Sequence, residues 1–149
     1  MKAIIICVSK HHGNTKRVAE AMAKVLKAGL VEPKDVELGK LKEYGLIGLG
    51  SGIYALRHDR DILELANKIP KLKASFFIFS TSGTGGTNYH KTLKKILESK
   101  GNKVIGEFAC PGYDTFSILK FFGGINKGRP NREDLEKAEN FAKKLLKKE

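Results

Sequence analysis

Short runs of apolar residues alternate along the chain with longer stretches in which apolar residues recur every three or four positions. Runs of the first kind are typical of buried strands, and the second spacing is that of a helix with one buried face. The pattern predicts strands at residues 3–8, 35–38, 46–49, 75–79 and 104–109. It predicts helices whose buried faces carry Val18, Met22, Val25 and Leu26; Ile62, Leu65, Ala66 and Ile69; Leu93, Ile96 and Leu97; and Leu135, Ala138, Phe141, Ala142 and Leu145.

Glycines, prolines and capping residues predict where these helices begin and end. Pro33 is expected to break the first helix, Pro70 to end the second and Gly101 to stop the third. Asn131 is expected to cap the last helix, because Asp134 follows it at the third helical position.

Repeated β–α units of this kind indicate an α/β fold with a doubly wound, mostly parallel sheet and helices on both of its faces. The chain has 149 residues and no repeat or linker, so we expect a single domain over residues 1–149. Such sheets bind ligands beyond the carboxyl ends of their strands. Four loops rich in glycine or hydroxyl residues are expected to converge there: 9–15, 50–59, 80–87 and 110–128.

The first of these loops, "SKHHGNT" (Ser9 to Thr15), has more polar groups than a turn requires. Gly13 permits a tight turn, and Asn14 or Thr15 is expected to cap the following helix. The free N–H groups and positive dipole of that helix would then favour an anion, best a phosphate. The alternative is an ordinary capped turn. The loop is not a Walker phosphate-binding loop, because the spaced glycines and the Lys-Ser/Thr pair are missing.

The second and third loops are each weak signals alone. "GSGIYALRHD" supplies flexible backbone and Tyr54, and "STSGTGGTNYH" supplies small residues that let backbone approach a flat ligand. Each could equally be a solvent loop. Their value as a prediction is that they share one edge of the sheet with Ser9 to Thr15.

Composition and charge limit the classes of site, location and partner that the chain is expected to have. Cys7 and Cys110 are too few for a disulfide framework, no Cys/His spacing resembles a zinc site, and Cys7 is expected to be a buried strand residue. No apolar run is long enough to span a bilayer, so a cytoplasmic location is expected. The net charge of +12 fits an acidic protein partner, nucleic acid, an anionic membrane or a solvated lysine-rich surface. Nucleic acid is not expected, because the lysines of the last helix lack interleaved aromatic residues.

Together these motifs resemble the flavodoxin family. The likeness rests on "GNT" after the first strand, "GSGIY" after the third and "STSGTGG" after the fourth, and continues through "GEFACPGYDTF" and "GRPNREDLEKAENFAKKL". It covers nearly the whole chain. The resemblance implies a flavodoxin-like three-layer sandwich with a five-stranded parallel sheet of order 2-1-3-4-5, one non-covalent FMN and electron-transfer activity.

The resemblance also implies roles for individual residues. The FMN phosphate would be held by His11, His12, Gly13, Asn14 and Thr15, with Ser9 and Lys10 beside it. The isoalloxazine ring would lie along Ser51, Gly52, Ile53 and Tyr54, with Tyr54 stacked on it. Its pyrimidine edge would meet the backbone of Ser80, Thr81, Ser82, Gly83, Thr84 and Gly85, and its other side would approach Gly112 and Tyr113. No catalytic residue and no metal are implied.

The leading interpretation is therefore a small flavoprotein that carries electrons between protein redox partners, with acidic docking surfaces expected on those partners. A second interpretation keeps the FMN but makes the chain an oxidoreductase of quinone or protoporphyrinogen type. A third is a flavin-free binding or signalling module. A response regulator would need an acidic cluster after the first strand, and "CVSKHH" has none.

Overall fold

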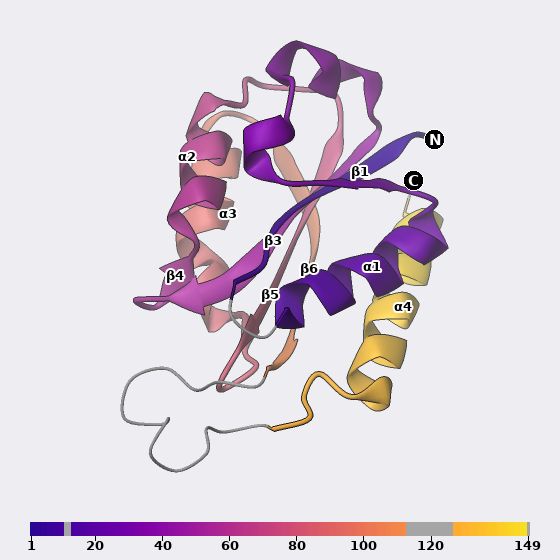
Figure 1. Cartoon of the computed structure of the whole chain (residues 1–149). Helices are drawn as coiled ribbons and strands as arrows, with labels where there is room; N and C mark the ends of the chain where they lie inside the picture. Colours follow the sequence, from indigo (N-terminus) through magenta and orange to yellow (C-terminus); the bar gives the residue numbers. More distant parts are fainter. Residues whose placement is uncertain (11–12, 113–126, 149) are drawn as a thin grey trace.

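The computed structural model describes residues 1–10, 13–112 and 127–148. Its centre is a parallel sheet whose strands run in the order β2-β1-β3-β5-β6, with the short β4 paired antiparallel to β3 (Figure 1). With β4 set aside, this is the predicted order 2-1-3-4-5. The strands are β1 (Ala3–Val8), β2 (Gly29–Val31), β3 (Leu46–Tyr54), β4 (Arg57–His58), β5 (Ser75–Ser82) and β6 (Lys103–Pro111).

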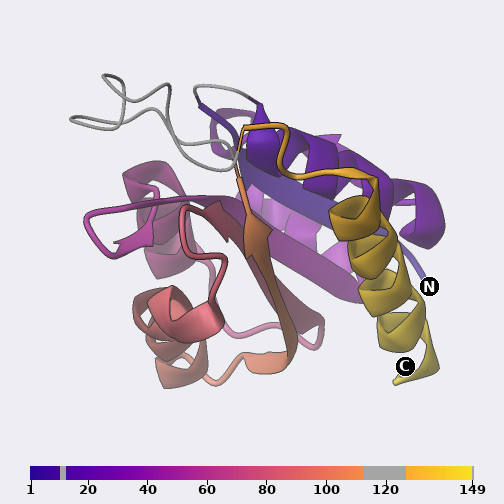
Figure 2. The ribbon, with the colours of Figure 1, turned by 90° about the horizontal axis from the view of Figure 1, so that it is seen from below.

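Helices cover both faces of this sheet, which confirms the predicted layers (Figure 2). The helices are α1 (Asn14–Leu26), α2 (Arg60–Lys68), α3 (Lys91–Ser99) and α4 (Arg132–Lys147). α1 and α4 enclose one apolar core with Phe77 and Phe79, and α2 and α3 enclose a second core with Phe76 and Ile78. Neighbouring residues of β5 thus serve opposite cores, because side chains alternate along a strand. No helix in the described part of the chain is long and apolar enough to cross a membrane.

The predicted second strand is wrong. Residues 35–38 lie at the boundary of two 3-10 helices, Pro33–Asp35 and Leu38–Glu43, and the strand beside β1 is Gly29–Val31 instead. α1 also ends before Pro33, at Leu26, where Lys27 takes a left-handed conformation with φ 54°. The chain therefore reverses earlier than the proline indicated. Pro33 begins the first 3-10 helix, where its fixed φ and missing N–H are acceptable.

The other predicted strands are in the right place, but three of them extend further toward their carboxyl ends. β3 continues through Gly50, Ser51 and Gly52, which pair with Phe79, Ser80 and Thr81 of β5. Gly48 and Gly50 make room for phenylalanine rings, since a Cβ atom there would lie 2.2 Å from a Phe77 ring atom or 2.3 Å from a Phe79 ring atom. Gly50 thus has a packing role in addition to any loop flexibility.

The helix starts are well explained by the sequence. The Asp59 carboxylate accepts from the Asp61 N–H at 2.8 Å and caps α2. Asn131 caps α4 as predicted, accepting from the Asp134 N–H at 3.0 Å, and the Asp134 carboxylate accepts from the Asn131 N–H at 2.8 Å. This reciprocal pair is a capping box. Of the predicted buried face of α4, Ala138, Ala142 and Leu145 are buried, while Leu135 and Phe141 are partly buried.

β6 pairs only with β5 among the described residues and is an edge strand. A register shift after Phe76 leaves Ile105 as an extra residue, and Lys148 Nζ donates to its carbonyl oxygen at 2.7 Å. A bulge and a lysine on an edge carbonyl both discourage pairing with another strand.

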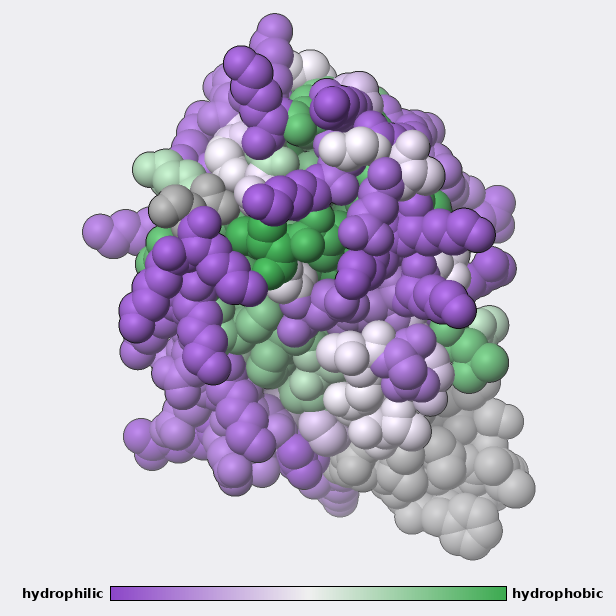
Figure 3. Space-filling model, turned by 180° about the vertical axis from the view of Figure 1, so that it is seen from behind, coloured by the Kyte–Doolittle hydropathy of each residue, from purple (hydrophilic) through white to green (hydrophobic). Residues whose placement is uncertain are grey.

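Figure 3 views the molecule from behind, where hydrophilic residues cover most of the surface around a central hydrophobic area.

Candidate functional site

The turn between β1 and α1 is built around Gly13, which has φ 68° and ψ 21° and is the residue that precedes the helix. The prediction that Asn14 or Thr15 caps α1 is wrong, because both lie inside the helix. The capping position is held by Gly13, which has no side chain to accept from the helix N–H groups. Ser9 acts instead, since its Oγ accepts from the Lys16 N–H at 3.1 Å. The glycine was recognised from the sequence, but the capping side chain comes from the other end of the loop.

Lys10 extends from this loop to the start of α2. Its Nζ lies 2.9 Å from Oδ2 of the buried Asp59, and this contact raises the pKa of Lys10. The ammonium therefore neutralises a helix-capping carboxylate in addition to adding positive charge beside the loop. The predicted residues His11 and His12 lie outside the described residues.

Three of the predicted loops are in direct contact at the carboxyl edge of the sheet. The hydroxyls of Thr15 and Thr81, both buried, are 2.8 Å apart and join the start of α1 to the end of β5. A Cβ atom on Gly112 would lie 2.7 Å from Nδ2 of Asn14, so the end of β6 lies against α1. Tyr113 lies outside the described residues.

The loop after β5 is closed by its own residues. Ser82 Oγ accepts from the Gly85 N–H at 2.9 Å, and the Ser82 carbonyl accepts from the Gly112 N–H at 3.0 Å. Gly85 has φ 71°, and a Cβ atom there would lie 2.8 Å from Pro111. Only glycine meets both the backbone requirement and the close approach. Gly83 and Thr84 lie between these anchors, with the Thr84 hydroxyl 3.3 Å from that of Tyr89.

The predicted 50s loop is a β-hairpin. Ile53 and Tyr54 of β3 pair with His58 and Arg57 of β4, and the two residues of the turn, Ala55 and Leu56, have φ of 50° and 66°. Positive φ at both central positions is the geometry of a type I′ turn, which normally uses asparagine and glycine. The sequence "YALR" therefore gave no hairpin signal.

Inside the hairpin, the predicted residues Ser51, Gly52 and Tyr54 have definite positions. Ser51 Oγ accepts from the Asp59 N–H at 2.8 Å and donates to the Gly52 carbonyl at 2.6 Å, which braces the hairpin. A Cβ atom on Gly52 would lie 2.8 Å from the Tyr54 hydroxyl, so the half-buried Tyr54 side chain lies across Gly52.

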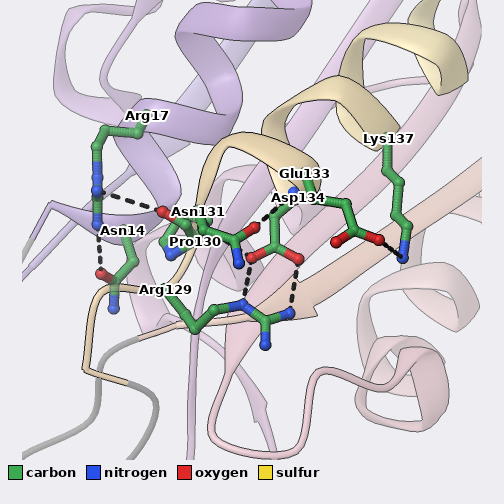
Figure 4. A network of polar contacts seen from close by, with 8 residues as sticks. All are labelled: Asn14, Arg17, Arg129, Pro130, Asn131, Glu133, Asp134 and Lys137. Atoms are coloured by element: carbon green, nitrogen blue, oxygen red, sulfur yellow. Dashed lines mark hydrogen bonds and ion pairs between the residues drawn. The ribbon is translucent and has the colours of Figure 1, made fainter.

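A cluster that the sequence did not reveal connects α1 to α4 (Figure 4). Arg129 makes a bidentate contact with the buried Asp134, at 2.5 Å from Nε and 2.7 Å from Nη2. The Arg129 guanidinium lowers the pKa of that carboxyl. Arg17 donates to the Pro130 carbonyl at 3.4 Å and to Asn14 Oδ1 at 3.2 Å. The first turn of α1 and the start of α4 are therefore held in fixed relation.

A second unpredicted cluster lies below the same edge, on the side of α2 and α3. Ser80 Oγ is 2.6 Å from Nε2 of His90, whose Nδ1 is 3.1 Å from Oε1 of Glu107. His58 Nε2 is 2.9 Å from the Phe79 carbonyl, and the two imidazole rings are 4.9 Å apart. The Ser80 side chain thus points into the protein, which leaves its backbone for the predicted contact.

The cysteines are not part of this edge chemistry. Both are buried, and burial raises the pKa of Cys7 and of Cys110 to about 12, so both are neutral thiols at pH 7. Cys7 is the buried strand residue that the sequence indicated. No group of metal-ligating side chains is found in residues 1–10, 13–112 and 127–148.

The start of α1 suits a phosphate by three criteria. Its first turn carries no acidic residue and includes Lys16 and Arg17. A helix N-terminus favours negative charge through its N–H groups and dipole. Among the described residues, none apart from the adjoining one comes within 4 Å of a Cβ atom placed on Gly13, so none of them fills the space beside this backbone.

Comparisons with known proteins agree with this geometry. A family model described as a flavodoxin domain matches residues 5–119. A curated but uncharacterised protein of Methanocaldococcus jannaschii is 44% identical over 149 residues, which is 99% of either chain. The solved oxidised flavodoxin 2 of Bacillus cereus is similar at a TM-score of 0.72 and 19% identity, covering 100% of both chains. A Fusobacterium nucleatum flavodoxin, solved with bound flavin mononucleotide, has a TM-score of 0.70 at 14% identity and 99% coverage of both.

Proposed function

Because the chain belongs to the flavodoxin family, we propose that it is a cytoplasmic electron carrier that binds one FMN without a covalent bond. The observation that supports this best is the acid-free start of α1 at Gly13, which the other described residues leave uncovered, within a domain of that family. FMN supplies the redox chemistry when bound, and the protein binds, orients and electrostatically tunes it.

The proposed contacts to FMN are of two kinds, those to its phosphate and those to its ring. Backbone would supply most of both kinds, because the side chains of Lys10, Thr15, Ser51 and Ser80 already have protein partners. The phosphate would lie at Gly13 and the first turn of α1, beside Ser9, His11, His12 and Asn14. The ring would lie between the hairpin at Gly52, Ile53 and Tyr54, the loop at Thr81, Ser82, Gly83, Thr84 and Gly85, and Gly112 with Tyr113.

Titration of the apoprotein with FMN and with riboflavin tests this proposal. The two ligands share the isoalloxazine ring, but only FMN has the phosphate that the α1 N-terminus would bind. We expect FMN to bind at least about tenfold more tightly, which is about 1.4 kcal/mol. Equal affinity would show that the phosphate loop is misassigned, and no binding of either flavin would overturn the proposed function.

Tyr54 is the next residue to test. An aromatic ring stacked on the flavin contributes about 1 kcal/mol beyond the area it buries. Tyr54→Ala is therefore expected to weaken FMN binding about fivefold and to shift both one-electron potentials, measured by fluorescence titration and redox titration. Tyr44→Ala is the matched control, because Tyr44 precedes the amino end of β3 and Tyr54 lies at its carboxyl end. Unchanged affinity and potentials in Tyr54→Ala would remove Tyr54 from the ring site.

Electron transfer is proposed to occur with acidic redox proteins that dock at the hairpin. In the turn of this hairpin, Leu56 is 75% exposed and is followed by the exposed Arg57. The whole chain has a net charge of +12. An apolar tip beside a cation fits a pocket with an acidic rim. Opposite charges accelerate encounter, and salt screens them.

We therefore expect electron transfer with an acidic ferredoxin to slow severalfold when ionic strength rises from about 0.01 M to 0.15 M in stopped-flow experiments. Arg57→Glu should slow transfer further at low salt. Lys147→Glu changes net charge equally but lies at the far end of α4, and it should have less effect. Rates that are indifferent to salt and to Arg57→Glu would place docking elsewhere.

A further inference from the structure

Two buried histidines lie together beneath the carboxyl edge of the sheet, where four elements meet. His58 comes from β4 and is 2% exposed, and His90 ends the 3-10 helix Thr87–His90 and is 0% exposed. Most buried polar side-chain atoms have a hydrogen-bond partner, so a buried imidazole nitrogen without one needs an explanation. The hydrogen bonds of the two rings show which nitrogens have partners.

The hydrogen bonds fix the tautomer of each ring. The Glu107 carboxylate can only accept, so His90 donates from Nδ1, and the Ser80 hydroxyl donates to Nε2. His90 is therefore fully satisfied. The Phe79 carbonyl also can only accept, so His58 donates from Nε2 and its Nδ1 is a bare acceptor. Within the described residues, His58 Nδ1 is the one buried side-chain nitrogen or oxygen without a hydrogen-bond partner.

The charges around His58 are already paired with one another. Lys94 from α3 lies 3.2 Å from the Glu107 carboxylate of β6, and Lys10 lies 2.9 Å from the Asp59 carboxylate at the start of α2. His90 is the titratable group in ring contact with His58, and its proximity adds to burial in lowering the pKa of His58. No carboxylate in the described part of the chain raises the pKa of His58. A new negative charge nearby would act strongly on His58, because the site is buried.

The new charge would come from the cofactor of the proposed function, on which this inference rests. We infer that His58 Nδ1 is the proton acceptor that responds when bound FMN gains its second electron. His58 pairs with Ile53 in the hairpin that also carries Gly52 and Tyr54, the segment proposed to lie along the ring. The electron comes from a one-electron reductant. At pH values between the pKa values of His58 with oxidised and with reduced FMN, a proton from solvent then binds Nδ1, and the added negative and positive charges cancel.

NMR titration of the histidine rings tests this in three samples: apoprotein, protein with oxidised FMN and protein with FMN fully reduced by dithionite. Burial lowers the pKa of His58 to about 4 in the protein without flavin. We expect the pKa of His58 to be at least one unit higher with reduced than with oxidised FMN, and that of His90 to shift less. A pKa of His58 that ignores reduction, or a larger shift at His90, would overturn the inference.

The redox potential gives a second readout. Between the two pKa values of His58, the potential for the second electron should fall as pH rises, and the slope approaches the limit of about 59 mV per pH unit, one proton for one electron, as the two pKa values move apart. His58→Gln removes the titrating nitrogen but keeps a donor that can reach the Phe79 carbonyl, and should lose this slope. His90→Gln should keep it. If the apoprotein binds no FMN, the proposed function fails; if FMN binds and His58→Gln keeps the full slope, only the present inference fails.

Discussion

Replacing Gly13 by valine is expected to reduce the affinity of the apoprotein for FMN at least tenfold. Gly13 has φ 68°, where a residue with a Cβ atom costs about 1–2 kcal/mol and a β-branched one more. The substitution also places two methyl groups in the space beside the start of α1, where the phosphate is proposed to lie. Isothermal titration calorimetry with FMN and with riboflavin measures the effect. Riboflavin affinity should change much less, because it has no phosphate.

Gly101→Val separates the backbone effect from the effect on the ligand. Gly101 also has a left-handed backbone, at φ 87°, but it follows α3 at the opposite end of the sheet from Gly13. Both variants should lower the free energy of unfolding, measured by urea denaturation, and only Gly13→Val should weaken FMN binding. If Gly13→Val binds FMN as tightly as the unmodified chain does, the phosphate lies elsewhere.

The parts of the fold that the sequence predicts are those with a continuous local signal. The cores of β1, β3 and β5 are unbroken apolar runs, and each amphipathic helix repeats its pattern over several turns. β2 was missed because Gly29–Val31 is too short to show a period, whereas Val36 and Leu38 imitate the alternation of a strand. The ends of β3 and β5 were cut short because Gly50, Gly52 and Thr81 resemble loop residues although they pair in the sheet.

The site was predicted as a set of loops but not as a set of side-chain contacts. Glycines carry local information, so Gly13 could be recognised as a turn position, and its φ is positive. Gly85 was expected only as a small loop residue, although its φ is also positive. Pairs distant in sequence carry none: the contacts of Lys10 with Asp59 and of His90 with Glu107 join different elements. A lone histidine or lysine does not indicate its partner. The prediction therefore placed Lys10 beside the phosphate without the contact that its ammonium makes with the Asp59 carboxylate.

Acidification is expected to destabilise the apoprotein through His58 well before most carboxylates are protonated. Its pKa is about 6.5 in an unfolded chain and about 4 in the folded protein, where burial opposes the charge. Between those values the unfolded state binds more protons, so stability is fully present above pH 6.5 and falls as pH approaches 4. The difference of about 2.5 units corresponds to about 3 kcal/mol. Burial also lowers the pKa of His90, which adds a loss of the same sign.

Urea unfolding of the apoprotein and of His58→Gln at pH 7 and pH 4 isolates the contribution of His58 to the free energy of unfolding. His58→Gln loses some stability at pH 7, but the groups other than His58 contribute almost equally to both proteins, so their effect cancels in the comparison. The unmodified chain should lose about 3 kcal/mol more than the variant between the two pH values. Equal losses would mean that His58 is protonated in the folded protein, with a partner for Nδ1. The bare nitrogen on which the proton-acceptor role depends would then not exist.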